Sequence, residues 1–311
     1  MSYSSGIMDM QVIISQMAVL FILIAAGYVT GKIKMLTTEG IKTLSRIVLN
    51  ISTPSVILTS VLGDTGGITV SKTAYFMLLT LIAHVLYFAV ALPASRALGK
   101  TKNTGLFCAM ITFGNVGFMG YPVAQAIFGF ESMYYAALFN VVFNIIVYSV
   151  GIIMISEKGG RVNLKVLLNA TLFASLISFI IVFTGFRVPN IISDALRLAG
   201  GINTPCAMLV IGATLSQIAF KDVFSEWRLY PVALLKVIVM PILSWLVFRQ
   251  FVTDELMLGL LIILSGMPIA AAVAMISIEY GGDGRIASSG IFLTTLISGA
   301  TIPLMVYVFL L

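Results

Sequence analysis

Charged residues are scarce in this 311-residue chain. Lysine and arginine contribute 18 residues and aspartate and glutamate 12, so that 10% of the sequence is charged while 59% is hydrophobic. Soluble domains carry about 25% charged and about 45–50% apolar residues, so this composition excludes a soluble globular protein. A mean hydropathy of +1.09 indicates a chain that lies almost entirely in a membrane, with the lipid bilayer as its surroundings.

The residue types that build metal centres and nucleophilic active sites are also few. Cys108 and Cys206 lie in apolar segments and form no CxxC or Cys/His pattern, so neither a disulfide framework nor a metal site is indicated. His84 is the only histidine, and no aspartate or glutamate is predicted at the membrane centre, since Glu279 and Asp283 fall near the end of an apolar run. The sequence therefore predicts no enzyme, no cofactor and no carboxylate proton relay.

Apolar runs of about 20 residues, the length that crosses a hydrocarbon core of about 30 Å, follow one another along the chain. Together they predict an all-α polytopic membrane protein with short connections. The first run is interpreted as a retained span and not as a signal peptide, because Asp9 but no basic residue precedes it and no small-residue cleavage site follows. The ten predicted spans are 11–31, 41–63, 73–97, 105–129, 132–155, 163–186, 195–218, 228–250, 255–280 and 286–311.

Basic residues are concentrated in the odd-numbered loops between these spans. Short cytoplasmic loops carry an excess of lysine and arginine, and the bias here is about three to one. It predicts cytoplasmic odd loops and both termini outside, and it explains the net charge of +6 without a nucleic-acid partner. The odd loops contain Lys32, Lys34, Lys42, Arg46, Arg96, Lys100, Lys102, Lys158, Arg161, Lys165, Lys221, Arg228 and Arg285, and the even loops contain Lys72, Arg187, Arg197 and Arg249.

The two halves of the chain share a weak internal repeat. Residues 51–58 (Ile-Ser-Thr-Pro-Ser-Val-Ile-Leu) align with 202–209 (Ile-Asn-Thr-Pro-Cys-Ala-Met-Leu), and the same offset brings Pro122 close to the position of Pro268. Five spans is an odd number, so the second copy must have the opposite orientation. This predicts a 5+5 inverted repeat, with chance matches among apolar helices as the alternative. The predicted boundaries are 1–155 for the first repeat, 156–162 for a cytoplasmic linker and 163–311 for the second repeat.

The fourth predicted span is unsuited to a continuous helix. Residues 114–122 (Gly-Asn-Val-Gly-Phe-Met-Gly-Tyr-Pro) place three glycines and a proline at mid-membrane depth. Glycine lowers helix preference by about 1 kcal/mol and proline removes a donor. The ninth span has a counterpart at 265–268 (Ser-Gly-Met-Pro). Unwound backbone in lipid must be buried or line a cavity, so two broken helices are expected to cross and to offer positive half-helix ends to an anion. Proline kinks that serve only packing are the alternative.

Polar side chains inside apolar runs are the remaining candidates, since intramembrane charge usually marks function. Lys236 lies in the middle of the eighth span and is expected to bind a substrate carboxylate or to take part in proton coupling. His84 occupies nearly the repeat-related position and is more simply explained as hydrogen-bonded locally. Asn115 and Asn203 are the amides expected to contact substrate. The other amides, interpreted mainly as links between helices, are Asn50, Gln125, Asn140 and Asn144.

Residues 114–122, with the paired Thr-Pro helices and the short basic central loop, make the sequence resemble the auxin efflux carrier family, which includes plant PIN-type carriers and bacterial relatives described as malonate transporters. The resemblance covers essentially the whole chain. It implies crossing helices four and nine marked by Pro122 and Pro268, a homodimer and elevator-like alternating access. Residues 156–163 are far fewer than the long central loop of the plant carriers, which argues against auxin itself as substrate. The predicted substrate-binding residues are Thr53, Asn115, Gly117, Tyr121, Pro122, Asn203, Thr204, Lys236 and Pro268.

The function predicted from these features is secondary transport of a small organic carboxylate anion across a bacterial inner membrane. An anion leaving the cell gains about 2.3 kcal/mol per charge per 100 mV from the inside-negative potential, so efflux needs no coupling ion, whereas uptake would need one. A channel or a transporter-like sensor without turnover is the alternative. The sequence lacks a repeated selectivity motif and a charged pore ring, which favours the carrier.

Overall fold

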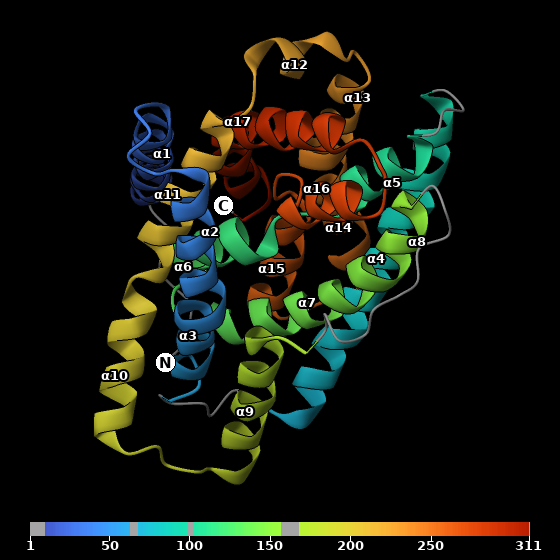
Figure 1. The fold of residues 1–311 in the computed structure, drawn as a ribbon. Helices are drawn as coiled ribbons and strands as arrows, with labels where there is room; N and C mark the ends of the chain where they lie inside the picture. Colours follow the sequence, from blue (N-terminus) through green and yellow to red (C-terminus); the bar gives the residue numbers. More distant parts are fainter. Residues whose placement is uncertain (1–9, 63–67, 99–102, 157–167, 311) are drawn as a thin grey trace.

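The computed structural model describes residues 10–62, 68–98, 103–156 and 168–310, and these are almost entirely helical (Figure 1). In the first half, α1 is Met10–Lys32, α2 Thr38–Ile47, α3 Thr53–Thr59, α4 Val70–Ala97, α5 Thr104–Thr112, α6 Tyr121–Phe128, α7 Ser132–Ile146 and α8 Ile152–Ile155. π-Helical turns at Val48–Ser52, Val116–Gly120 and Val147–Gly151 precede α3, α6 and α8.

The second half also contains both long and interrupted helices. Its elements are α9 Ala170–Thr184, α10 Asn190–Gly201, α11 Asn203–Ser216, α12 Phe220–Ser225, α13 Leu229–Leu234, the π-helical turn Leu235–Val239, α14 Met240–Phe248, α15 Glu255–Ser265, α16 Ala271–Glu279 and α17 Gly284–Phe309.

Six helical stretches of the described residues are long and apolar enough to cross a membrane. They are Ile14–Lys32, Val70–Ala97, Ser132–Ile155, Asn190–Ser216, Leu229–Phe248 and Gly284–Phe309. The other predicted spans contain shorter apolar helices, among them Val116–Phe128, Ala170–Thr184 and Glu255–Ser265. The structure thus has the helical and apolar character of a polytopic membrane protein, and its interrupted helices coincide with the glycine- and proline-rich segments.

The predicted central linker, residues 156–162, lies outside the described residues except for Ser156. The helix that follows it, α9, begins at Ala170. It is therefore shorter in the described structure than the predicted span 163–186.

The helices pack into two groups. In the first, α1 runs along α11, and α3 packs against α9 and α10. In the second, α4 packs on α5 and α7, α14 on α15, and α16 on α17. Figure 1 shows the first group as the blue and yellow helices at the left and below, beside the green and red helices of the second. Contacts of α1 with α6, of α9 with α7 and of α11 with Val116–Gly120 join the groups.

Glycines allow α1 and α11 to touch along their backbones. A Cβ atom on Gly212 would lie 1.9 Å from the carbonyl oxygen of Ile24, and one on Gly27 would lie 2.4 Å from that of Leu209. Small residues permit such close approach between membrane helices, where van der Waals packing is a main source of association. The two helices therefore form a tightly bound pair.

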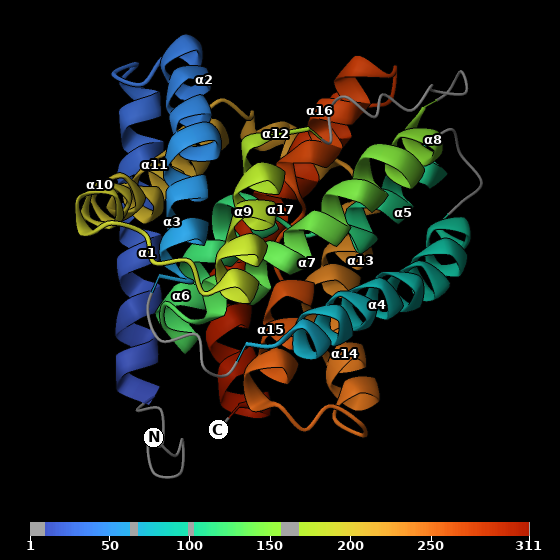
Figure 2. The same cartoon turned by 90° about the horizontal axis from the view of Figure 1, so that it is seen from below.

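The outer faces of the molecule are apolar. Large exposed side chains project from α1, α4, α9, α10 and α17, including Ile22, Val85, Phe173, Ile191 and Leu304. Such a surface suits a protein whose solvent is lipid. Figure 2 shows α1 beginning and α17 ending on the same side of the molecule.

Candidate functional site

The two interrupted spans are bound to each other at their breaks. After α5, the chain is extended through Phe113, and before α16 it is extended at Ala270. The backbone N–H of Asn115 donates to the carbonyl oxygen of Pro268 at 2.7 Å, and the N–H of Ala270 donates to the carbonyl oxygen of Phe113 at 3.0 Å. Gly114 and Ile269 thus face each other in a single antiparallel bridge. We call residues 113–115 and 268–270 the crossing.

These two hydrogen bonds pair backbone N–H and C=O groups that have no partner within a helix, because the helices are interrupted there. An unpaired amide in hydrocarbon costs several kcal/mol, and each break supplies a donor to the other. The N–H of Ile269 is also bound, by the hydroxyl oxygen of Thr294 in α17 at 3.1 Å. The crossing is therefore held from within and from a neighbouring helix.

One side of the crossing carries the amino end of a half-helix. The side-chain oxygen of Asn115 accepts a hydrogen bond from the backbone N–H of Phe118 at 3.2 Å, so Asn115 caps the turn Val116–Gly120. A Cβ atom on Gly117 would have no atom within 4 Å. The capped turn therefore borders open space, and α11 packs against it from the other group of helices.

The carboxyl ends of two half-helices also meet at the crossing, and Lys236 binds both. Its Nζ atom donates to the carbonyl oxygen of Ser265, the last residue of α15, at 3.0 Å, and to that of Thr112, the last residue of α5, at 3.3 Å. The side chain is 1% exposed. The structure thus places the ammonium on backbone carbonyls, where a cation complements the negative helix ends.

His84 lies beside this arrangement in an aromatic cluster. Its ring packs against those of Tyr87, Phe113 and Phe139 at centroid distances of 5.7, 6.4 and 5.3 Å. Its Nδ1 atom is 2.8 Å from the carbonyl oxygen of Thr80 one turn earlier. This bond agrees with the expectation that His84 is hydrogen-bonded locally. Its contact with Phe113 also means that His84 packs against the crossing.

A hydrogen bond between two hydroxyl groups joins the helices that flank the crossing. Tyr87 in α4 and Ser244 in α14 lie 2.8 Å apart through their side-chain oxygens, and both are buried. Because α4 packs on α5 and α14 on α15, this bond ties the supports of the two broken spans together.

The repeat-related Thr-Pro segments meet in a separate place. The hydroxyl of Thr53 donates to the side-chain oxygen of Asn203 at 2.9 Å, and both residues are buried. The Asn203 Nδ2 atom has no hydrogen-bond partner among the described residues. Thr204 is half-buried on the same helix. These residues therefore link α3 to α11 within the first group of helices, and their described bonds do not reach the crossing.

The prolines that were expected to mark the crossing have different positions. Pro268 takes part through its carbonyl oxygen. Pro122 lies beyond the contact, as the second residue of α6, and Tyr121 before it is fully buried. The helix ends at Phe113, before the glycines, and Pro122 lies within the helical stretch Val116–Phe128, directly after its π-helical turn.

Sequence reasoning did not identify the carbonyl groups of Thr112 and Ser265 as ligands. Their side chains are ordinary small polar groups in apolar runs. The signal that could have identified them is their position in the sequence. Thr112 and Ser265 come directly before the glycine- and proline-rich segments at which α5 and α15 end. Among the described residues, no group of three or more histidine, cysteine, aspartate or glutamate side chains could hold a metal ion.

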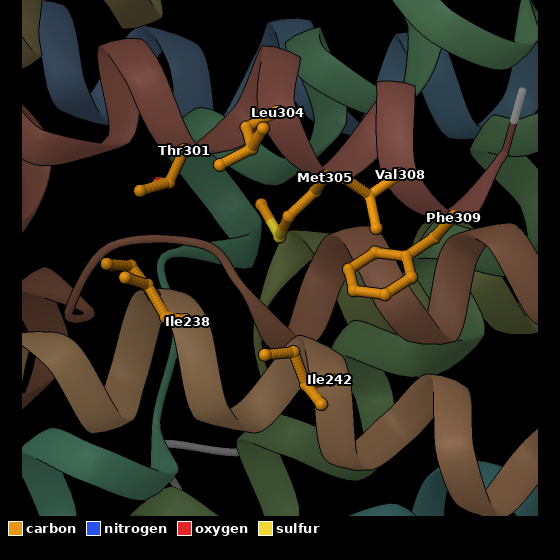
Figure 3. Close-up of a pocket in the computed structure, with 8 residues that line it drawn as sticks. Ile238, Ile242, Thr301, Leu304, Met305, Val308 and Phe309 are labelled. Carbon is orange, nitrogen blue, oxygen red and sulfur yellow. The ribbon is translucent and has the colours of Figure 1, made fainter.

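An apolar groove lies elsewhere, between α14 and α17 (Figure 3). Figure 3 shows Ile238 and Ile242 on one wall, with Met305 and Phe309 among the side chains that face them from α17. The groove has a volume of about 130 Å³, and Thr301 is its one polar lining residue. It offers no charge or donor cluster for an anion, so it is a poor candidate for the binding of a carboxylate.

Comparison with known proteins agrees with this architecture. A family model described as Membrane transport protein matches residues 12–165 and 160–306. An uncharacterized transporter of Methanothermobacter thermautotrophicus is 27% identical over 289 residues, which cover 91% of this chain and 94% of the relative. One of Methanocaldococcus jannaschii is 27% identical over 300 residues, covering 92% and 95%. A Rhizobium meliloti protein named "Putative malonate transporter" is 23% identical over 240 residues, covering 73% of each chain.

Proposed function

This chain belongs to the Membrane transport protein family, and from that membership we propose that it is a secondary transporter of small organic carboxylate anions. The match confirms the resemblance to the auxin efflux carrier family, and the relatives are named as transporters. The single observation that carries the proposal is the crossing, where Asn115 and Pro268 join two broken helices.

The crossing supplies features that an anion requires. The turn after Asn115 begins a half-helix, and the positive end of its dipole favours negative charge. Gly117 borders open space beside this turn. We place the substrate carboxylate there, against Asn115 and Gly117. The name of the Rhizobium meliloti relative supports a dicarboxylate such as malonate.

The remaining predicted residues take different parts in this proposal. The helix group that contains α11 faces the turn Val116–Gly120. Its residues Thr53, Asn203 and Thr204 shape the wall of the substrate site that lies opposite this turn. Tyr121 and Pro122 are the first two residues of α6. They follow the turn Val116–Gly120 directly and hold its carboxyl end in place. Pro268 maintains the crossing. Lys236 acts through the helix ends that it binds.

Alternating access in this proposal is elevator-like. The group that contains the crossing, with α4 to α7 and α14 to α17, moves past the group of α1, α3 and α9 to α11. Contacts between the groups are made by α1 with α6, α7 with α9 and α11 with the turn at Val116–Gly120. The substrate position at Gly117 lies at this boundary, which supports exposure to one side of the membrane and then to the other.

The topology that accompanies this mechanism has ten spans in two inverted halves, 1–155 and 163–311. Odd loops are cytoplasmic, both termini are outside, the membrane is a bacterial inner membrane and the assembly is a homodimer. An even number of spans returns the chain to its starting side, and the positions at which α1 begins and α17 ends support this.

Transport into proteoliposomes tests the function. Labelled malonate and other small carboxylates are presented with and without an imposed potential or pH gradient, to the wild type and to Asn115→Ala. Asn50→Ala is the matched control, because Asn50 is exposed and, among the described residues, its side chain bonds to the carbonyl oxygen of Arg46 one turn earlier. Saturable exchange lost in Asn115→Ala and kept in Asn50→Ala supports the proposal.

Other outcomes contradict it. Single-channel currents would identify a channel. Absence of transport for every carboxylate, with the protein folded, would exclude the anion assignment.

A further inference from the structure

The surroundings of the Lys236 ammonium are those of a bound cation. No acidic side chain forms an ion pair with it in the described part of the chain, and its hydrogen bonds go to two backbone carbonyls at 3.0 and 3.3 Å. An ammonium has three donors and no acceptor. A buried charge without an acidic partner must be compensated by dipoles. Here the compensating groups come from Thr112 and Ser265, at two helix ends.

The charge balance at this point suits one monovalent cation. Each helix carboxyl end carries roughly −0.5 elementary charge. α5 and α15 both end at Lys236, so their ends together offer roughly one negative charge. In transporters with interrupted helices, half-helix carboxyl ends and unwound carbonyls are also the groups that coordinate Na⁺.

The backbone leaves little room around the ammonium. A Cβ atom on Gly114 would lie 3.1 Å from Lys236 Nζ and 3.2 Å from the carbonyl oxygen of Leu264. A glycine at the crossing therefore allows the ammonium to reach the carbonyls. The absence of a side chain at Gly114 thus leaves the space that the Lys236 ammonium occupies.

We propose that Lys236 is a built-in cation, whose ammonium occupies the position at the crossing that a coupling Na⁺ or K⁺ ion would otherwise take. It follows that the wild-type protein neither binds nor requires such an ion for the assembly of the crossing, and that removal of the ammonium opens a monovalent cation site. This deepens the proposed function, because it assigns the carrier a mechanism without sodium coupling.

Thermal unfolding of the purified protein tests the site without any substrate. The wild type, Lys236→Ala and Lys236→Met are compared in NaCl, KCl and choline chloride at equal ionic strength. We expect equal midpoints in the three salts for the wild type, and a saturable rise of several degrees in NaCl or KCl for Lys236→Ala. Lys236→Met is the matched control, since its long apolar side chain fills the space, and it should show no rise.

Three results would overturn the proposal. They are stabilisation of the wild type by Na⁺ or K⁺ over choline, a folded Lys236→Ala protein with no cation response, and an equal response in Lys236→Met. If Lys236→Ala does not fold, the wild-type comparison decides by itself: equal midpoints support the built-in cation and a cation-dependent midpoint excludes it.

The test separates this inference from the proposed function. A cation response restricted to Lys236→Ala supports the built-in cation even if no carboxylate is transported. Conversely, carboxylate transport that requires Na⁺ in the wild type would support the carrier and exclude the built-in cation.

Discussion

Asn115 and Pro268, which lie in different halves of the chain, are joined by a backbone hydrogen bond of 2.7 Å. Neither side chain makes this bond. The contact requires instead that two helices be open at the same depth, which residues 113–115 and 266–270 provide. Several consequences of this arrangement can be measured.

Gly114→Ala should destabilise the crossing. The new methyl group would meet Lys236 Nζ at 3.1 Å and the Leu264 carbonyl oxygen at 3.2 Å, and overpacking of this kind costs about 1–3 kcal/mol. The midpoint of thermal unfolding should fall and transport should be lost. Gly201→Ala is the control, because a Cβ there meets nothing within 4 Å. Equal midpoints for the two variants would show that the crossing tolerates a side chain.

Asn115→Asp should separate capping from anion binding. Aspartate retains an oxygen that can accept the Phe118 N–H, whereas Asn115→Ala removes the cap at a cost of about 1 kcal/mol. The added negative charge should repel a carboxylate. We therefore expect Asn115→Asp to retain stability and to raise the KM for malonate, and Asn115→Ala to lose both stability and transport. A normal KM in Asn115→Asp would move the substrate away from this turn.

Thr53→Val should destabilise the link between α3 and α11. The side-chain oxygen of Asn203 would lose its buried donor, and an unsatisfied buried polar group costs about 1–3 kcal/mol. Thr184→Val is the control, because the Thr184 hydroxyl is exposed and its two bonds, to the carbonyl oxygen of Ile180 and from the N–H of Phe186, are local and exposed. Chemical denaturation in detergent compares the two, and a loss confined to Thr53→Val is expected. Equal stabilities would mean that water replaces the threonine.

Cysteine labelling tests the proposed orientation. In a background with Cys108→Ala and Cys206→Ala, Lys42→Cys should react with a membrane-impermeant maleimide only after the membrane is opened. Arg249→Cys should react in intact cells. The reverse pattern would place the termini in the cytoplasm and contradict the positive-inside assignment.

The existence of the two breaks could be predicted from the sequence, but their positions could not. Glycine and proline lower helix preference locally, so residues 114–122 and 265–268 indicate interruption. The chain opens at Phe113, whereas Pro122 lies within the helical stretch Val116–Phe128, after its π-helical turn. The position of the opening depends on hydrogen bonds with the other half of the chain, which local propensity does not contain.

The hydrogen-bond partners of Lys236 also could not be predicted from the sequence. A lysine within an apolar run indicates function, but its partners depend on how the turn Leu235–Val239 packs against α5 and how α14, which follows it, packs against α15. The sequence suggested a carboxylate or a proton, and the structure shows the carbonyl oxygens of Thr112 and Ser265. Thr53 and Asn203 were found through the repeat, yet their direct bond to each other follows from helix packing alone.

The crossing has a consequence for synthesis of the chain. Phe113 to Asn115 leave the ribosome and enter the membrane long before Pro268 and Ala270 exist. Until then, the Asn115 N–H lacks the acceptor that it has in the finished protein, and an unpaired amide in hydrocarbon costs several kcal/mol. The nascent first half must therefore keep this segment near water, within the insertion machinery, or against another helix. A ribosome stalled before residue 268 would hold a protein whose central segment still lacks the partner that it has in the finished fold.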